Sequence, residues 1–223
     1  DMERVDMIKN FLEFLISLAP EGETALIVRQ KPIIKDGQMQ FHPDGAIKCT
    51  WPAYLPDVRR IKGDQAWYGN TASFVVDRLG EHVSASASNC EYVLVMVLDD
   101  VGTKAKLPPL APTWIMETSK GSYQWGYAFG DDQPKKGEFS AAIKAIANAG
   151  YTDPGATNAV RNFRLPGSIN LKPGRNNFAA QLIEFHPDRL FTLPQICEAL
   201  GVTPSEADSA GPTPIKIVDT GDD

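Results

Sequence analysis

The chain has 223 residues, of which 43% are hydrophobic and 22% charged, and its formal net charge is −6. This length and composition are typical of a globular protein with a full core, and no stretch approaches the ~18 apolar residues of a membrane span. The cysteines and histidines are few and scattered, so the sequence indicates neither a disulfide framework nor a structural zinc site.

The first residues carry carboxylates at Asp1, Glu3 and Asp6, where a signal peptide would have a basic region followed by an apolar one. The scarcity of cysteine also favours a reducing compartment. We therefore expect a cytoplasmic protein with no membrane partner.

Hydrophobic periodicity and turn residues predict helices, strands and loops along the chain. At the start, apolar residues recur at helical spacing until Pro20, which predicts a helix over residues 2–19. The elements predicted next are a strand at 24–30, the start of another at 33–34, hairpins and loops at 36–63, an aromatic turn at 67–74 leading into a helix through Leu79, a buried strand at 92–98 and a loop at 104–112. They are followed by a hairpin of strands 114–118 and 123–127, a helix at 139–148, strands 163–165 and 169–171 around a type II turn at Pro166-Gly167, a strand at 178–185 and a helix at 193–200.

Strands and helices without strict alternation indicate an α+β fold. From Thr203 onward the composition shifts to Ser, Ala, Gly, Pro and Asp, so that residues 204–223 are predicted to be a linker or a disordered tail. The rest of the chain is long enough for one large domain, or for one domain with a small accessory unit.

The most informative segment is the apolar run Tyr92–Leu98, which is followed directly by Asp99 and Asp100. Because the run lacks polar alternation, it predicts a strand buried on both faces. Carboxylates at the rim of a sheet are the hard oxygen ligands that Mg²⁺ or Mn²⁺ prefers. The alternative is that the two aspartates only end the strand and open a turn. Adjacent side chains of an ideal strand point to opposite faces, so either a bulge brings both carboxylates together or only one is a ligand.

A second feature is the stretch Pro154–Ile183, which contains no Asp or Glu. The same stretch carries Arg161, Arg164, Lys172 and Arg175. A local basic surface in an acidic chain suits an anionic ligand such as a nucleoside triphosphate or a short nucleic-acid backbone. The alternative is chance clustering on a solvated face.

These features, together with the turn Ser119–Ser122 and Asp153, form a candidate site. The backbone N–H groups, the hydroxyls and Lys120 of the turn suit a phosphate. Acids, a metal and cations are the groups that phosphoryl or nucleotidyl transfer requires. The residues alone therefore predict metal-dependent phosphate chemistry.

Three segments, Val97–Lys104, Glu117–Tyr127 and Asp153–Lys172, carry a resemblance to a known family. In this order they resemble the archaeo-eukaryotic primase superfamily, and within it the plasmid RepB-type and phage or prophage primases. The resemblance covers about residues 65–200, and its most specific part is the string Arg-Leu-Pro-Gly-Ser-Ile-Asn-Leu-Lys that ends at Lys172.

The resemblance implies a catalytic core of the RNA-recognition-motif type at about residues 81–203, with an N-terminal α/β unit at about 1–80. It implies template-directed primer synthesis on single-stranded DNA from nucleoside triphosphates, with two divalent metal ions (Mg²⁺ or Mn²⁺), in phage or plasmid replication within a bacterial host cell. Members often precede a helicase, toward which residues 204–223 would lead.

The resemblance also implies roles for individual residues. Asp99, Asp100 and Asp153 would be the catalytic, metal-binding acids. The second motif of the family often holds a histidine that contacts the incoming nucleotide, and since this chain has none there, Gln124, Lys120 or backbone amides would substitute. The full set of implied nucleotide-binding residues is Ser119, Lys120, Gly121, Gln124, Arg161, Arg164, Asn170 and Lys172.

Several alternatives stay open. Arg164 is either a phosphate ligand or a structural arginine bonded to carbonyls, and Glu117 is either a further metal ligand or faces solvent. Trp67 and Tyr68 either stack on a template base or belong to the core. At the level of function, the alternative to an enzyme is a non-catalytic replication-initiator or single-strand-binding module that retains the fold, which the missing histidine favours. A rolling-circle nicking enzyme would need a metal-binding His-x-His pair, which the sequence lacks.

Overall fold

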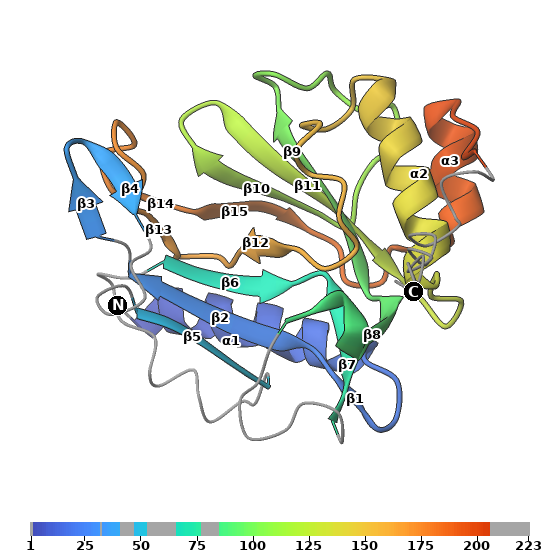
Figure 1. Cartoon of the computed structure of the whole chain (residues 1–223), viewed down its shortest axis with the longest axis horizontal. Coiled ribbons are helices and arrows are strands. Elements are labelled where there is room, and N and C mark those ends of the chain that lie inside the picture. The colour runs from blue at the N-terminus through green and yellow to red at the C-terminus, as the bar shows by residue number, and fades with distance from the viewer. Residues whose placement is uncertain (1, 32, 41–46, 53–65, 77–84, 206–223) are drawn as a thin grey trace, which may run out of the picture.

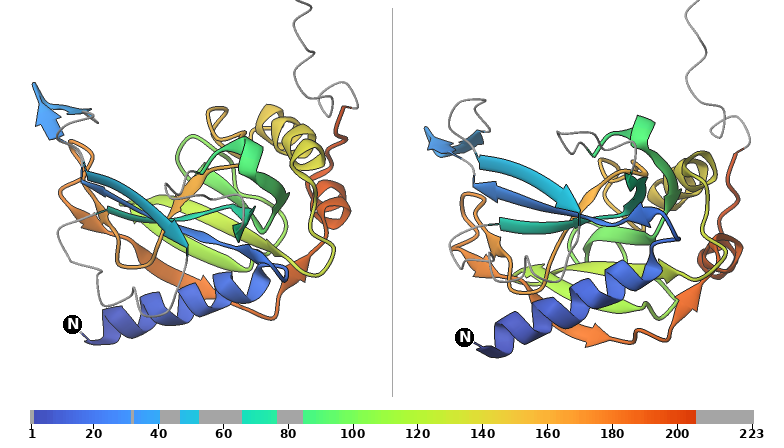
Figure 2. Two further views of the ribbon diagram at one scale, coloured as in Figure 1. Left: turned by 60° about the horizontal axis from the view of Figure 1, so that its bottom comes forward. Right: turned by 90° about the horizontal axis from the view of Figure 1, so that it is seen from below.

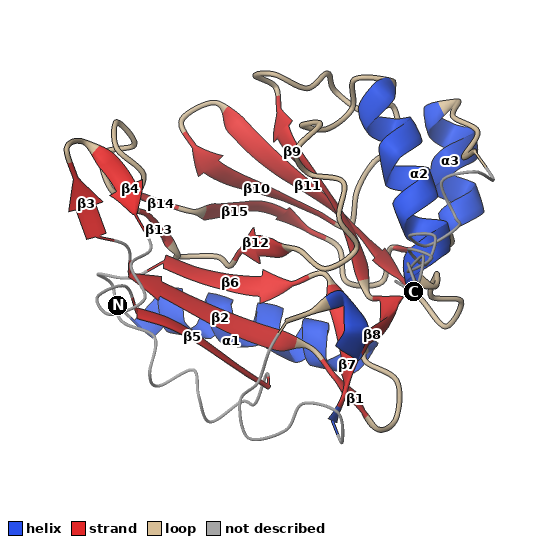
Figure 3. Ribbon diagram, viewed as in Figure 1, coloured by secondary structure: helices blue, strands red, loops and turns tan. Residues whose placement is uncertain are grey.

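The computed structural model describes residues 2–31, 33–40, 47–52, 66–76 and 85–205. Two large, mainly antiparallel sheets and three helices make up most of this part (Figure 1, Figure 3). None of the described helices has the length and hydropathy needed to cross a membrane.

The larger sheet has five strands and carries the apolar run. Its order is β15 (Gln181–Phe185), β10 (Trp114–Ser119), β11 (Ser122–Phe129) and β9 (Val95–Val101), with β16 (Leu190–Phe191) parallel to the end of β11. The second sheet has four strands in the order β12 (Asn162–Arg164), β6 (Ala66–Asn70), β2 (Leu26–Lys31) and β5 (Ile47–Pro52). Smaller sheets pair β1 (Glu23–Thr24), β7 (Ala72–Val75) and β8 (Cys90–Val93), β3 (Ile33–Lys35) with β4 (Gln38–Gln40), and β13 (Ile169–Asn170) with β14 (Phe178–Ala179).

Helix α1 (Met2–Leu18) packs against residues of both large sheets (Figure 2). The Phe11 ring meets Trp114 of β10 edge-on, with 5.2 Å between ring centroids, and lies 6.3 Å from Phe163 of β12. Aromatic pairs at such distances add to the stability that apolar burial provides. This cluster is one of the main hydrophobic cores and ties the second sheet to the larger one.

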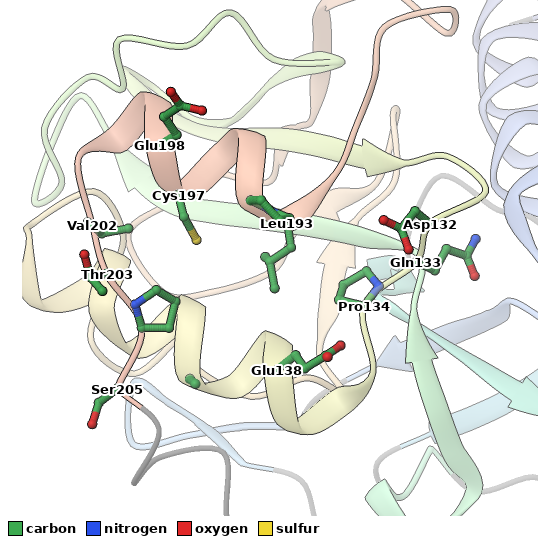
Figure 4. Close-up of a pocket in the computed structure, with 13 residues that line it drawn as sticks. Asp132, Gln133, Pro134, Glu138, Leu193, Cys197, Glu198, Val202, Thr203 and Ser205 are labelled. Atoms are coloured by element: carbon green, nitrogen blue, oxygen red, sulfur yellow. The ribbon is translucent and has the colours of Figure 1, made fainter.

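Helices α2 (Lys136–Asn148) and α3 (Leu193–Leu200) pack against the opposite face of the larger sheet, where Phe139 of α2 meets Phe129 of β11 edge-on. A cavity of about 630 Å³ lies between the two helices (Figure 4). Leu193 and Cys197 contribute apolar surface to it, whereas Glu138 and Glu198 add carboxylates.

The structure confirms the helices predicted at 2–19, 139–148 and 193–200, and α2 begins earlier than predicted, at Lys136. The prediction for residues 67–74 is wrong, because they form strands β6 and β7 and not a turn that enters a helix. Trp67 and Phe74 are fully buried, since β6 and β7 each pair with neighbours on both sides. Leu79 and most of the predicted loop 36–63 lie outside the described residues.

The apolar run is buried on both faces as predicted, but it forms two strands that belong to different sheets. The chain leaves β8 at Leu94, whose N–H donates to the Thr71 carbonyl (2.8 Å) and whose carbonyl accepts from the Phe129 N–H (2.9 Å). Strand β9 then continues through Asp99 and Asp100 to Val101, so the aspartates lie within the strand and not beyond its end.

The two predicted parts of the domain share a sheet, because β12 pairs with β6 of the N-terminal part. Thr71 reinforces this connection: its N–H donates to the Arg161 carbonyl (2.8 Å), and its hydroxyl donates to the Ala159 carbonyl (2.7 Å). The boundary near residue 80 stays a prediction, and the described strands on either side of it are joined by main-chain hydrogen bonds.

The packing of Trp114 on Gly126 gives a testable prediction. A Cβ at Gly126 would lie 1.9 Å from Cε2 of the Trp114 ring, which is fully buried. Gly126→Ala should therefore lower the free energy of unfolding by about 2 kcal/mol or more, as overpacking does. In the control Gly130→Ala the new Cβ meets Leu190 at 3.6 Å, and the change should stay within about 0.5 kcal/mol. Equal denaturation midpoints for the two variants would contradict this account.

Candidate active site

A β-bulge in β9 brings the two adjacent aspartates to one face of the sheet. Leu98 pairs with Trp125 and Val101 with Tyr123, so Asp99 and Asp100 together oppose Gln124. Asp100 adopts a left-handed conformation with φ 56°, and its N–H donates to Asp99 Oδ1 (2.9 Å).

The contacts of the two carboxylates show that they share this face. The Ser122 hydroxyl donates to Asp100 Oδ1 (3.4 Å), and Gln124 Nε2 donates to Asp99 Oδ1 (3.4 Å). Ser122 and Gln124 lie two residues apart on β11 and therefore on the same side of the sheet. That side faces the second sheet, since the Gln124 side chain also accepts from the Arg164 N–H of β12 (3.2 Å).

Asp99 forms an ion pair with Arg161. Arg161 Nη2 lies 2.6 Å from Asp99 Oδ2, and each side chain is only 21% exposed. The backbone of Asp99 is held as well, because its N–H donates to Thr152 Oγ1 (2.9 Å). Asp99 is thus neutralised and oriented by side chains from outside its own sheet.

Asp100 and Asp153 share a different cation, Lys104. Lys104 Nζ lies 3.2 Å from Asp100 Oδ2 and 4.0 Å from Asp153 Oδ2. The hydrogen bond with Asp100 raises the pKa of Lys104. The pKa of Asp153 is lowered, first by the hydrogen bond that its carboxylate accepts from the Gly155 N–H (2.9 Å), and also by the charge of Lys104.

The chemistry of this pair fits a divalent metal ion. A cationic group already lies between two carboxylates from separate segments, and carboxylate oxygens are the ligands that Mg²⁺ and Mn²⁺ prefer. Within the described residues, no group of three or more His, Cys, Asp or Glu side chains is arranged to hold a metal by itself. Mg²⁺ commonly uses one or two carboxylates together with substrate phosphates, so the pair is sufficient for a metal that a nucleotide helps to bind.

The predicted hairpin between β10 and β11 is confirmed, with Lys120 and Gly121 at its turn. Lys120 is exposed, whereas Ser119 is buried. Glu117 closes the turn, because its Oε1 accepts from the Gly121 N–H (2.9 Å). Glu117 is therefore a structural partner of the turn, and this N–H is not open to a phosphate while the bond is present.

The type II turn at Pro166-Gly167 is also confirmed: the Ser168 N–H donates to the Leu165 carbonyl (3.0 Å), and Gly167 has φ 76°. The flanking strands, however, do not form a hairpin with one another, because β12 pairs with β6 and β13 with β14. Strands 163–165 and 169–171, predicted on either side of this turn, therefore do not present Arg164 and Lys172 from one hairpin, since Arg164 lies in β12 and Lys172 lies beyond the end of β13.

The residues of this segment differ in exposure. Arg164 is 5% exposed, and its guanidinium donates to the Ile169 carbonyl and to Asn170 Oδ1, both at 3.0 Å. This is the arrangement of a structural arginine, the alternative that the sequence leaves open. Asn170 is buried as well, whereas Lys172 is exposed.

Two residues near the acids were not predicted from the sequence, Lys104 and Thr152. The available signal was their position, since Lys104 follows Asp100 by four residues and Thr152 precedes Asp153. Trp67 belongs to the core, and the Tyr68 ring lies 5.1 Å from the Arg164 guanidinium carbon.

No protein-family model matches the sequence, and no curated protein matches it. Among solved structures, the chain is similar to the AEP domain of the primase-polymerase of cyanophage S-2L, with a TM-score of 0.60, 16% identity, and coverage of 87% of this chain and 97% of the other. It is also similar to primase RepB′, with a TM-score of 0.54, 15% identity, and coverage of 87% and 62%. For the RepB′ catalytic domain in complex with initiator DNA, the TM-score is 0.54, the identity 16%, and the coverage 88% and 94%.

At these identities the likeness is one of fold. The chain shares its fold with the AEP domain of the cyanophage S-2L primase-polymerase and with the catalytic domain of primase RepB′, which confirms the predicted α+β class.

The lowered pKa of Asp153 gives a testable prediction. Replacing Lys104 by Met removes a charge that favours the ionised carboxylate, so the pKa of Asp153 should rise toward its ordinary value of 3.8. Because the folded-state pKa is depressed, this group stabilises the fold at pH above the ordinary value, and that stabilisation is lost as the pH falls through the lowered pKa. Carbon-13 NMR titration of the Asp153 carboxyl in wild type and Lys104→Met measures the change. Lys106→Met, which removes a lysine that stacks on Tyr151, is the control and should leave the titration unchanged.

Proposed function

We propose that this domain synthesises nucleic-acid primers on single-stranded DNA by metal-dependent nucleotidyl transfer. The observation that carries the proposal is the bulge at Asp99-Asp100, which turns both carboxylates to the face where Lys104 and Asp153 lie. This arrangement occurs in a fold shared with a phage primase-polymerase and with the catalytic domain of primase RepB′.

In this proposal Asp100 and Asp153 hold Mg²⁺ or Mn²⁺ together with the phosphates of the nucleotide, in place of the Lys104 ammonium. The metal would offset the negative charge that develops on the transferring phosphoryl group. Asp99 is already paired with Arg161 at 2.6 Å, so its carboxylate is less available to a metal than those of Asp100 and Asp153. Asp100 and Asp153 are accordingly the first ligands that we assign.

The exposed lysines are the candidate contacts for the triphosphate. Lys120 lies at the hairpin turn, four residues before Gln124, and Lys172 follows Asn170. Charge-assisted contacts of this kind are worth roughly 1.5–3 kcal/mol each, so the loss of one should weaken nucleotide binding about tenfold or more. Ser119, Gln124, Arg164 and Asn170 are buried, and we assign them to the support of these contacts.

Single-stranded DNA is the proposed template, since one of the similar structures contains initiator DNA. Nucleoside triphosphates are the proposed substrates, and phage or plasmid replication is the proposed setting. We also propose that a helicase holds the template for this domain, because the net charge of −6 gives poor long-range attraction to a polyanion.

A primer-synthesis assay on single-stranded DNA with labelled nucleotides and Mg²⁺ or Mn²⁺ tests the proposal. Asp153→Ala and Asp100→Asn should abolish incorporation, while the free energy of unfolding changes by no more than about 1 kcal/mol. The control is Asp131→Asn, an exposed carboxylate beyond the other end of β11, which should keep full activity. A folded wild-type domain that incorporates no nucleotide with either metal would refute the enzymatic function, and full activity of Asp153→Ala would refute the metal assignment.

The exposed lysines and the negative net charge together give a prediction about DNA affinity. The isolated domain should bind single-stranded DNA weakly, and binding should vanish at moderate ionic strength, because only a few lysines and arginines offset its net charge. If Lys172 contacts a phosphate of the bound strand, Lys172→Ala should reduce the slope of log K against log salt by about 0.7. Lys9→Ala, on α1 where Lys9 pairs with Glu13, is the control. Fluorescence anisotropy over a salt series measures both slopes, and tight, salt-insensitive binding would contradict the prediction.

A further inference from the structure

A chain of buried hydrogen bonds links the Asp99 carboxylate to the two segments that carry the exposed lysines. Its members are the side chains of Gln124, Arg164 and Asn170, which we call the polar brace, and each is 5–6% exposed. Gln124 donates to Asp99 Oδ1 (3.4 Å) and accepts from the Arg164 N–H (3.2 Å). The Arg164 guanidinium then donates to Asn170 Oδ1 (3.0 Å).

At its far end the polar brace holds the backbone on both sides. Asn170 Nδ2 donates to the Thr118 carbonyl (2.9 Å), which lies two residues before Lys120. Asn170 Oδ1 also accepts from the Lys172 N–H (3.3 Å). Asn170 therefore fixes the turn that carries Lys120 relative to the segment that carries Lys172.

The polar brace is costly to bury. Among the described residues, no carboxylate lies within hydrogen-bond or ion-pair distance of the Arg164 guanidinium, and burial lowers its pKa. A buried charge of this kind is tolerated only when its donors are satisfied in a fixed geometry. The Ile169 carbonyl, Asn170 and the face of Tyr68 supply that geometry.

We propose that Arg164 and Asn170 are positioning residues, which set the position of the lysines that contact the triphosphate relative to Asp99, the neighbour of the metal-binding Asp100. They act on Asp99 through Gln124, and on Lys120 and Lys172 through the backbone. The inference rests on the proposed function for the identity of the ligand, a nucleoside triphosphate with a divalent metal. It assigns Arg164 no contact with that ligand.

The test compares Asn170→Ala with Thr113→Ala. Thr113 is fully buried, donates to the Arg189 carbonyl (2.7 Å) and accepts from the Ala128 N–H (2.9 Å), but it lies at the opposite end of β10 from Lys120. Each variant loses hydrogen bonds of a buried polar side chain, so both should lower the melting temperature. Only Asn170→Ala should weaken the binding of ATP with Mn²⁺, measured by calorimetry, by about tenfold or more, as the loss of a supporting residue does. Equal effects of the two variants on ATP binding would overturn the proposal.

Two further variants separate positioning from direct contact. Asn170→Asp keeps the acceptor for Arg164 and Lys172, so it should restore the Lys172 amide resonance that Asn170→Ala shifts and should recover part of the affinity. Arg164→Ala combined with Asn170→Ala should cost no more than the more damaging single variant, because both act through one network. Additive losses would overturn the proposal and indicate that Arg164 contacts the nucleotide itself. If Arg164→Ala does not fold, the comparison of Asn170→Ala with Thr113→Ala still tests the proposal.

Calorimetry also separates this inference from the proposed function. A wild-type domain that binds ATP with Mn²⁺ but makes no primer refutes primer synthesis and leaves the test of the polar brace valid. A wild-type domain that binds no nucleotide refutes both.

Discussion

The ion pair between Asp99 and Arg161 is the contact on which the arrangement of the site depends. Asp99 belongs to β9 of the larger sheet, and Arg161 directly precedes β12 of the second sheet. The two charges are 2.6 Å apart and both side chains are mostly buried, so dissolved salt screens this pair much less than it screens a surface ion pair. Thr71 fixes the backbone of Arg161 through hydrogen bonds to both its carbonyl and its N–H, at 2.8 and 3.0 Å. The acids therefore lie where two sheets meet, and neither sheet alone provides their surroundings.

The bulge at Asp100 illustrates how local strain is maintained at such a junction. A non-glycine residue with φ 56° is uncommon, and it persists only when surrounding contacts hold it. Here Ser122, Lys104 and the Asp99 carboxylate each contact Asp100. The strained residue and the charged cluster support each other, because the bulge brings the carboxylates together and their partners fix the bulge.

Local patterns in the sequence were sufficient to predict helices α1, α2 and α3, the turn at Pro166-Gly167 and the burial of the apolar run before Asp99. It failed where pairing is non-local: β6 has the aromatic and glycine content of a turn, and only its neighbours β2 and β12 make it a strand. The candidate acids could be selected from the sequence, but the bulge that unites two of them depends on the register with β11. The burial of Arg164 likewise follows from tertiary contacts that no spacing reveals, whereas the four-residue spacing of Asp100 and Lys104 was visible in the sequence.

The pairing of β12 with β6 also constrains the order in which the domain folds. Asn70 and Asn162, which share a hydrogen bond across these strands, are 92 residues apart in the chain. Closing so long a loop is entropically unfavourable, and domains dominated by such distant contacts fold slowly. During synthesis on the ribosome, the second sheet lacks one of its strands until β12 has emerged. Until then Asp99 cannot form its ion pair with Arg161. A nascent chain that ends before this point carries all the residues of the bulge but not the partner that orients them.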